Sequence, residues 1–307
     1  MPAAESAPSA PPLRDRLLVL ALLLLGASAS LLGHWVLRQA EARHEQQRSL
    51  AAAQAVHIQV EQALTRTLEA ARSAALMVET HPDLQQRDFM HYAQQLTAQL
   101  PPITFLEWQP WVAHAERAGF EQAARAQGLP DFEIREPVAG GTQWQRAPER
   151  PHYVPVLYGW PAGVAPLGFN LEPDDARMAS KRRAAAERRP VASGSFPVLR
   201  QAGGAAPVQS PQPVTGFAIT APVFTYQPSG PTLRGYLAAV IELPSLFDAV
   251  TRQAEASQFA LWVYEGARPQ GPLRYHSGLG DDAAPAAGGP EQALQQQLTV
   301  DVAGQPW

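Results

Sequence analysis

The residue types that could do chemistry are scattered along this chain and form no known catalytic pattern. Its eight histidines never take the His-x-x-x-His or His-Glu-x-x-His spacing that puts two zinc ligands on one helix face. Ser193-Gly194-Ser195 lacks the Gly-x-Ser-x-Gly frame of a nucleophile elbow. Glu107 and Glu116 can be imagined as an acid and base pair, but nothing fixes their separation. The sequence therefore predicts no catalytic residue, no metal site and no cofactor, and the chain is not expected to be an enzyme.

The composition limits the partners. A formal net charge of −4 argues against nucleic acid. The chain has no cysteine, which excludes disulfides and thiolate chemistry. Its 307 residues, 46% of them hydrophobic, suffice for one large or two modest domains.

The stretch His152–Arg177 has the pattern of a binding pocket. It opens with the alternating run Tyr153–Tyr158, passes through a loop rich in proline and glycine, and continues with the short apolar segment Leu167–Leu171. Asp174 and Asp175 then mark the start of a helix. Because a strand, a loop and a capped helix at a sheet edge commonly enclose a small molecule, this stretch indicates binding rather than catalysis.

Further motifs lie on both sides of this stretch in a regular order. Together they resemble the CHASE sensor domain, over roughly Ala70 to Val250. The motifs that carry the resemblance are Trp108-Gln109-Pro110-Trp111-Val112, Glu116-Arg117, Phe120-Glu121, Tyr153–Tyr158, Leu167–Leu171, the helix start at Pro173–Arg177, Thr220-Ala221-Pro222-Val223-Phe224 and Arg234-Gly235-Tyr236-Leu237.

The resemblance implies an extracytoplasmic small-molecule sensor of a membrane-bound histidine kinase or diguanylate cyclase, similar to plant cytokinin receptor ectodomains. It implies ligand contacts from Asn170 and Thr220 and a backbone contact near Ala192; Trp108 and Phe224 are predicted to line the same pocket. The family has an aspartate where this chain has Asn170. Since an amide donates and accepts whereas a carboxylate only accepts, the cytokinin ligand is not carried over. An alternative role for Asn170, as a local turn or cap residue, stays open.

The N-terminal part has the pattern of a membrane anchor. Residues 1–16 are predicted to be a disordered cytoplasmic tail, and the apolar run Leu17–Leu37 is long enough to span a bilayer. Arg14 and Arg16 favour a cytoplasmic N-terminus, which places the rest in the periplasm at the inner membrane. Ala27-Ser28-Ala29 is compatible with signal cleavage, but the apolar run continues beyond it and favours a retained anchor.

Residues 38–102 are predicted to form a stalk helix and further N-terminal helices. No proline occurs between Gln39 and Glu79, and small or apolar side chains recur about every 3.5 residues. This seam indicates either a homodimer interface or packing on the domain of the same chain, and the sequence leaves both open. The seam residues are Ala53, Val56, Val60, Leu64, Thr67, Ala71, Ala74 and Val78.

The predicted fold class is α+β: an anchor helix, a long stalk helix and, as the resemblance implies, tandem PAS-like subdomains with antiparallel sheets. Residues 103–242 would form the membrane-distal, ligand-binding subdomain and residues 243–307 the membrane-proximal one. The output domain is expected outside this chain. Lys181, the only lysine among 24 Lys and Arg residues, lies in a basic cluster that is interpreted as a solvated helix face.

Two other functions remain open from the sequence. One is a membrane-tethered extracytoplasmic enzyme, such as a hydrolase, which convergent His, Asp and Ser side chains would favour. The other is a structural dimerising ectodomain, which a completely filled core would favour.

Overall fold

The computed structural model describes residues 13–138, 143–164, 166–198, 214–247, 261–266, 271–277 and 297–306. The chain divides into two units: a larger one, Gln54–Gly289 with Gln297–Trp307, and a smaller one, Met1–Ala53 with Pro290–Gln296. Most of the predicted N-terminal tail, residues 1–12, lies outside the described residues.

Helix α1 (Leu13–Thr80) begins in the smaller unit and includes the end of the predicted tail. It is continuous because no proline interrupts it before Pro82. The apolar side chains described between Leu22 and Leu37 are exposed. Across the described ranges, no helix is long and apolar enough to cross a membrane, so the predicted span at Leu17–Leu37 is not confirmed.

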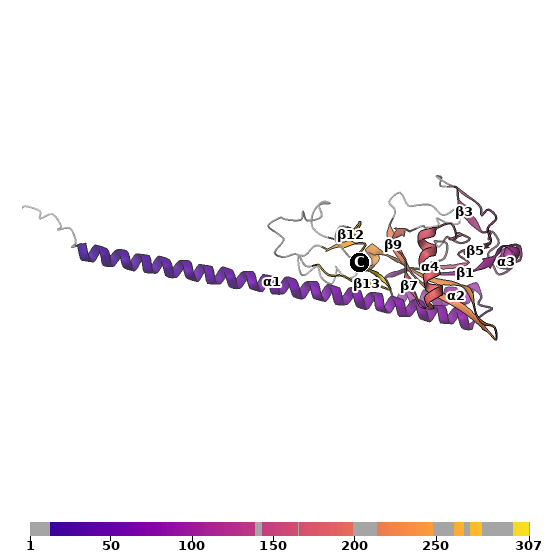
Figure 1. Cartoon of the computed structure of the whole chain (residues 1–307), viewed down its shortest axis with the longest axis horizontal. Helices are drawn as coiled ribbons and strands as arrows, with labels where there is room; N and C mark the ends of the chain where they lie inside the picture. The colour runs from indigo at the N-terminus through magenta and orange to yellow at the C-terminus, as the bar shows by residue number, and fades with distance from the viewer. Residues whose placement is uncertain are drawn as a thin grey trace, which may run out of the picture. The chain divides into compact units, whose positions relative to one another are not determined.

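A six-stranded antiparallel sheet organises the larger unit, with the order β6-β1-β10-β9-β7 and with β8 paired to β9. Figure 1 labels its strands β1, β7 and β9. Strands β9 and β10 form a long hairpin, which the register Gly230↔Gln227 closes with a short turn. The strands are β1 (Ile103–Pro110), β6 (Tyr158–Trp160), β7 (Val191–Ala192), β8 (Phe196–Pro197), β9 (Thr215–Gln227) and β10 (Gly230–Glu242).

Shorter elements surround this sheet. In the described part of the chain, four ribbons of two strands each pair antiparallel, and three further α-helices and a 3₁₀ turn follow α1. The helices are α2 (Gln86–Gln99), η1 (His114–Glu116), α3 (Arg117–Ala126) and α4 (Asp175–Glu187); the ribbons are β2 (Val112–Ala113) with β5 (His152–Tyr153), β3 (Arg135–Pro137) with β4 (Trp144–Arg146), β11 (Leu261–Tyr264) with β12 (Leu273–Ser277), and β13 (Asp301–Val302) with β14 (Gln305–Pro306).

The two faces of the sheet have different partners, because side chains alternate along each strand. One face is apolar and packs against α2 and the part of α1 that belongs to the larger unit; it includes Leu106, Ile219 and Leu237. The other face lies under α4 and includes polar side chains such as Glu107 and Thr220. A polar site on this sheet is therefore expected on the second face, under α4.

The predicted stalk seam packs on the domain of the same chain. Within the larger unit, Val56, Val60 and Leu64 are buried in the core that also contains the sheet. Ala71 and Ala74 have no exposed surface, and their small side chains allow α1 to approach the sheet closely. The intramolecular alternative thus accounts for the periodicity, and dimerisation through the seam is not shown.

Changing Val60 to Asp is expected to unfold the larger unit rather than to dissociate a dimer. Val60 is 5% exposed, so the variant places a carboxylate in an apolar core and should lower the free energy of unfolding by roughly 3 kcal/mol or more. Ile58→Asp is the matched control, because Ile58 is also β-branched, lies on the same helix and is 51% exposed. Urea denaturation followed by circular dichroism would measure both; equal losses would contradict the packing described above.

The fold is a mixed helical and antiparallel-sheet structure with a long N-terminal helix, as predicted, whereas the tandem PAS-like architecture is not confirmed. Beyond Glu242, the described strands form two separate ribbons instead of one second sheet. Leu243, Phe247, Val263 and Val302 share one core with the main sheet. A local alternating pattern does not determine which strands pair, so the sequence could not decide between one second sheet and separate ribbons.

Candidate functional site

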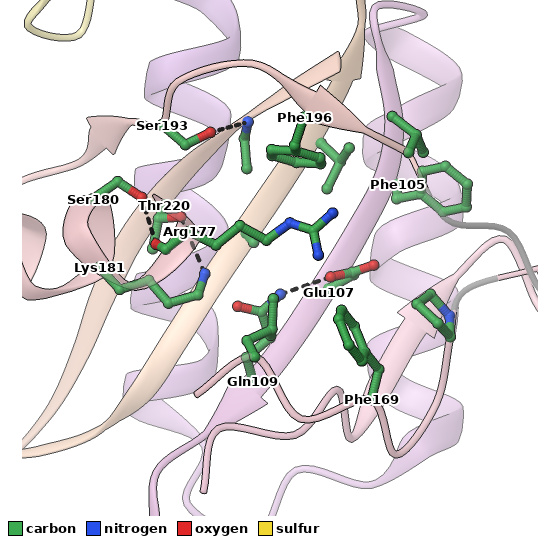
Figure 2. Close-up of a pocket in the computed structure, with 16 residues that line it drawn as sticks. Phe105, Glu107, Gln109, Phe169, Arg177, Ser180, Lys181, Ser193, Phe196 and Thr220 are labelled. Carbon is green, nitrogen blue, oxygen red and sulfur yellow. Dashed lines mark hydrogen bonds between the residues drawn. The ribbon is translucent and has the colours of Figure 1, made fainter. Parts of the chain in front are cut away.

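A cavity of about 30 Å³ lies between the sheet and α4. Figure 2 shows Arg177 and Lys181 extending from the helix toward Glu107 and Gln109. The cavity lining combines polar or charged side chains with an aromatic wall. The polar and charged residues are Glu107, Gln109, Arg177, Ser180, Lys181, Ser193 and Thr220, and the aromatic residues are Phe105, Phe169 and Phe196.

The strand register explains how the sheet makes room for this cavity. Glu107 pairs with Ala238, and Ala238 pairs with Thr220, so the three residues form a row across β1, β10 and β9. Neighbouring strands lie about 4.8 Å apart, which separates the outer two residues by roughly 10 Å. Because the middle position is an alanine, the space between Glu107 and Thr220 is not filled from the sheet side.

Helix α4 supplies the cations. Asp174 caps the helix by accepting a hydrogen bond from the Arg177 backbone N–H at 3.0 Å. Arg177 and Lys181 are four residues apart and so lie on one face. Met178 is 1% exposed and anchors the helix in an apolar cluster with Phe169 and Leu171. The apolar packing of α4 therefore holds both basic side chains over the sheet.

The loop before α4 provides part of the aromatic wall. Gly168 has φ of 79°, and a Cβ atom there would lie 2.2 Å from the Glu133 carbonyl oxygen, so only glycine fits. Gly168 and Phe169 are also held by backbone hydrogen bonds to Val156, of 2.8 and 3.0 Å. This close approach of two backbone segments directs Phe169 into the cavity.

Lys181 is a buried ammonium group with few partners. It is 2% exposed, and its Nζ donates to Thr220 Oγ1 at a long distance of 3.5 Å. Its Nζ also lies 5.5 Å from the centre of the Tyr236 ring. Burial lowers the pKa of Lys181 from 10.5 to about 7, which the attraction of Glu107 only partly offsets.

Glu107 faces the cavity from the sheet, and burial raises the pKa of its carboxyl group. Gln109 donates to Glu107 Oε2 at 2.6 Å and, with more distant Lys181 and Arg177, opposes this shift. The other amide atom, Gln109 Oε1, is buried without a hydrogen-bond partner in the described structure. An acceptor is thus left free at the floor of the cavity.

Arg177 is held along the cavity by two of its three guanidinium nitrogens. One pairs with Asp174 at 3.2 Å, and another donates to the Pro197 carbonyl at 3.2 Å. The guanidinium carbon lies 4.2 Å from the centre of the Phe196 ring. Burial lowers the pKa of Arg177, and its Nε is buried without a partner among the described residues.

The structure brings only one of the five predicted ligand-binding residues into the cavity lining. Thr220 is fully buried there. Trp108 points to the opposite face of β1 and belongs to the core beneath α1 and α2. Ala192 is a core residue paired with Ile219, although the following residue, Ser193, does line the cavity. Phe224 is half-buried, four residues beyond Thr220, and is not part of the lining.

Asn170 does not face the cavity with Thr220, contrary to the prediction that the two share it. Its Oδ1 accepts a hydrogen bond from the Val154 N–H at 2.9 Å, and its Nδ2 donates to Glu136 Oε1 at 2.6 Å. Because Phe169 contributes to the aromatic wall, alternation turns its neighbour Asn170 away. Asn170 thus fits the alternative of a local structural residue, and it connects two loops.

Sequence reasoning missed Arg177, Lys181 and Glu107 as members of one site. Lys181 was interpreted as part of a solvated face, which holds for exposed Arg182 but not for Lys181. One signal was present: Arg177 and Lys181 share a helix face, and Lys181 is the only lysine in an arginine-rich chain. What was missing is the pairing of distant strands that brings Glu107 opposite that helix.

The CHASE domain family model matches residues 82–275, which is more than half of the chain. The chain therefore belongs to the CHASE domain family. CHASE domains are extracytoplasmic sensor domains rather than catalytic ones, so this chain contains the sensor region of a signalling receptor.

Two further comparisons add little. A solved structure titled "Methyl-accepting Chemotaxis protein X" aligns with a TM-score of 0.38 and 10% sequence identity, covering 73% of this chain and 87% of that one. At this score the likeness does not establish a common fold. No curated protein sequence matches the chain.

Proposed function

We propose that the cavity between the sheet and α4 binds a small molecule, and that the chain is the extracytoplasmic sensor region of a membrane-bound histidine kinase or diguanylate cyclase. The observation that supports this most strongly is the set of buried polar groups without sufficient partners. Lys181, Arg177 Nε and Gln109 Oε1 are all buried groups around one cavity. Since an unpaired buried polar group costs about 1–3 kcal/mol, a ligand that pairs with these groups is favoured.

Contacts of α4 offer a route for the signal. Arg183, two residues after Lys181, donates to the Ala303 carbonyl at 3.1 Å, and the Ala192 N–H donates to the same oxygen at 3.3 Å. A shift of α4 or β7 on ligand binding would therefore change the contacts of the ribbon β13–β14. Only the difference in binding energy between two such arrangements can be transmitted.

The cavity does not favour a hydrolase. Its two serine hydroxyls are bonded to the backbone: Ser180 donates to the Arg177 carbonyl at 2.8 Å, and Ser193 to the Gly194 carbonyl at 2.7 Å. A structural ectodomain is not favoured either, because a filled core would not keep charged groups around an open space. Homodimerisation and the subdomain limits 103–242 and 243–307 remain part of the proposal.

Thr220→Ile is expected to abolish ligand binding while leaving the fold intact, because it fills the cavity and removes the hydroxyl that Lys181 contacts. Native mass spectrometry of the purified chain should detect a co-purified small molecule that this variant loses. Thr232→Ile is the matched control: Thr232 is exposed on the neighbouring strand β10, so this variant should retain the molecule. Equal retention of the molecule by Thr220→Ile would contradict binding in this cavity.

A further inference from the structure

The charged groups of the cavity define the chemistry of a ligand more narrowly than sensing alone. Lys181 is a cation without a carboxylate at ion-pair distance in the described part of the chain, and its one hydrogen bond, to Thr220, is long. The positive charge of Arg177 is different, because Asp174 already pairs with it at 3.2 Å. The charge left without a close partner is therefore that of Lys181, and an anionic group would satisfy it.

A second requirement comes from the sheet side of the cavity. Gln109 Oε1 is an acceptor on a residue that is 1% exposed, and it has no partner among the described residues. The Glu107 carboxyl beside it receives a hydrogen bond from Gln109 alone. A ligand that satisfies this side must carry a polar hydrogen, such as that of a hydroxyl or amino group.

The dimensions of the cavity limit the ligand. A single water molecule needs a cavity volume of about 10–15 Å³. A cavity of about 30 Å³ therefore admits only a very small molecule unless its walls move. The rings of Phe105, Phe169 and Phe196 bound the space and leave little room for a longer chain. The anionic group and the donor must therefore be close together.

We propose that the sensed ligand is a compact organic acid anion that also carries a hydroxyl or amino group, with its carboxylate on Lys181 and its polar hydrogen on Gln109 and Glu107. Arg177 Nε supplies an additional donor for the carboxylate. This inference rests on the proposed function, since it specifies the ligand class of the same cavity.

The ionisation of Lys181 adds a pH dependence that can be measured. The titratable groups that face it are Glu107 from β1, Tyr236 from β10, and Arg177 and Asp174 from α4. Because the pKa of Lys181 is about 7, the free protein holds a protonated Lys181 below pH 7 and loses that proton above it. Binding of an anion requires the proton, so the affinity should fall about tenfold between pH 6 and pH 8.

Isothermal titration calorimetry of the full chain tests the proposal with glycolate, glycine, acetate and neutral acetamide at pH 6. Saturable binding is expected for glycolate and glycine, weaker binding for acetate, and none for acetamide. Lys181→Met should abolish binding, since the variant keeps an unbranched side chain of nearly the same length and removes its charge. The Arg182→Met variant should bind glycolate and glycine as the wild-type protein does, because Arg182 carries the same charge on the same helix but is exposed.

Two calorimetric results would overturn the ligand class. One is the absence of saturable binding by every carboxylate probe, and the other is binding that Lys181→Met leaves unchanged. The proposed function would be refuted by a different result from the ligand class. A co-purified neutral or cationic molecule that Thr220→Ile releases would refute the anion and support sensing in this cavity, whereas retention of that molecule by Thr220→Ile would refute the cavity itself.

Discussion

Replacing Lys181 by Met should make the unliganded protein more stable while it removes ligand binding. The wild-type protein holds an ammonium group that is 2% exposed and lacks a close carboxylate partner. Replacing buried ionic groups with apolar residues of similar volume often stabilises a protein by roughly 1–4 kcal/mol. For a chain of this size, each kcal/mol raises Tm by about 2–4 °C. Differential scanning calorimetry at pH 6 would measure the gain.

The stability gain should depend on pH with a defined sign. Lys181 has a pKa of about 7 in the folded protein and about 10.5 when unfolded, so the unfolded chain binds more protons between these values. The wild-type protein should therefore gain stability as pH rises from 7 toward 10, and its deficit relative to Lys181→Met should be largest below pH 7. A difference that stays constant from pH 6 to pH 10 would contradict a buried, depressed lysine.

Arg182→Met is the control for this experiment as well. Arg182 is 56% exposed, and its ion pair with Asp175 is long, at 3.8 Å, so its replacement should change the free energy of unfolding by no more than about 0.5 kcal/mol. If Lys181→Met is more stable and yet does not bind, misfolding cannot explain the loss of binding. This combination is expected where a binding site keeps a group that the fold alone disfavours.

Asn170→Asp should destabilise the protein strongly near neutral pH, although the two side chains have nearly the same shape. The variant would replace the amide that donates to Glu136 at 2.6 Å with a second carboxylate, at a position without exposed surface. Glu136 is already paired with Arg150 at 2.7 Å, so the second carboxylate would have no cation of its own at this contact. We expect a loss on the order of 3 kcal/mol or more in the free energy of unfolding.

Low pH should partly restore the stability of the Asn170→Asp variant. Two neighbouring carboxylates repel each other, so the folded-state pKa of the introduced carboxyl group should lie above the unfolded value of about 3.9 for aspartate. The deficit of Asn170→Asp should therefore be small near pH 4 and grow as pH rises. Urea unfolding at several pH values would follow it, with Gln95→Glu on the exposed side of α2 as the control for an added charge. An unchanged stability at pH 7 would exclude the structural role of Asn170.

Several elements followed from local sequence alone. The long helix α1 was predictable because no proline occurs between Gln39 and Glu79. The start of α4 followed from Asp174 and Asp175. Likewise, the order of short motifs from Trp108 onward was enough to identify the CHASE domain family, which the match over residues 82–275 confirms.

The roles of individual polar residues were decided by tertiary structure. Thr220, predicted from its strand, and Asn170, predicted from its motif, are both buried, yet only Thr220 lines the cavity. Periodicity assigned Val60 to a buried seam, but it could not tell whether a second chain or the sheet of the same chain covers that seam. Lys181 has the same local signature as its exposed neighbour Arg182.

By itself, the sequence determined the family, the long N-terminal helix, the start of α4 and the absence of a cysteine-based chemistry, because these depend on residue types and near neighbours. Only the tertiary structure placed Glu107 in one row with Ala238 and Thr220 and set Lys181 above them. These residues come from three strands and a helix that are distant in the chain. Their environment, and with it the pKa of Lys181, depends on strand register and burial, which no local pattern encodes.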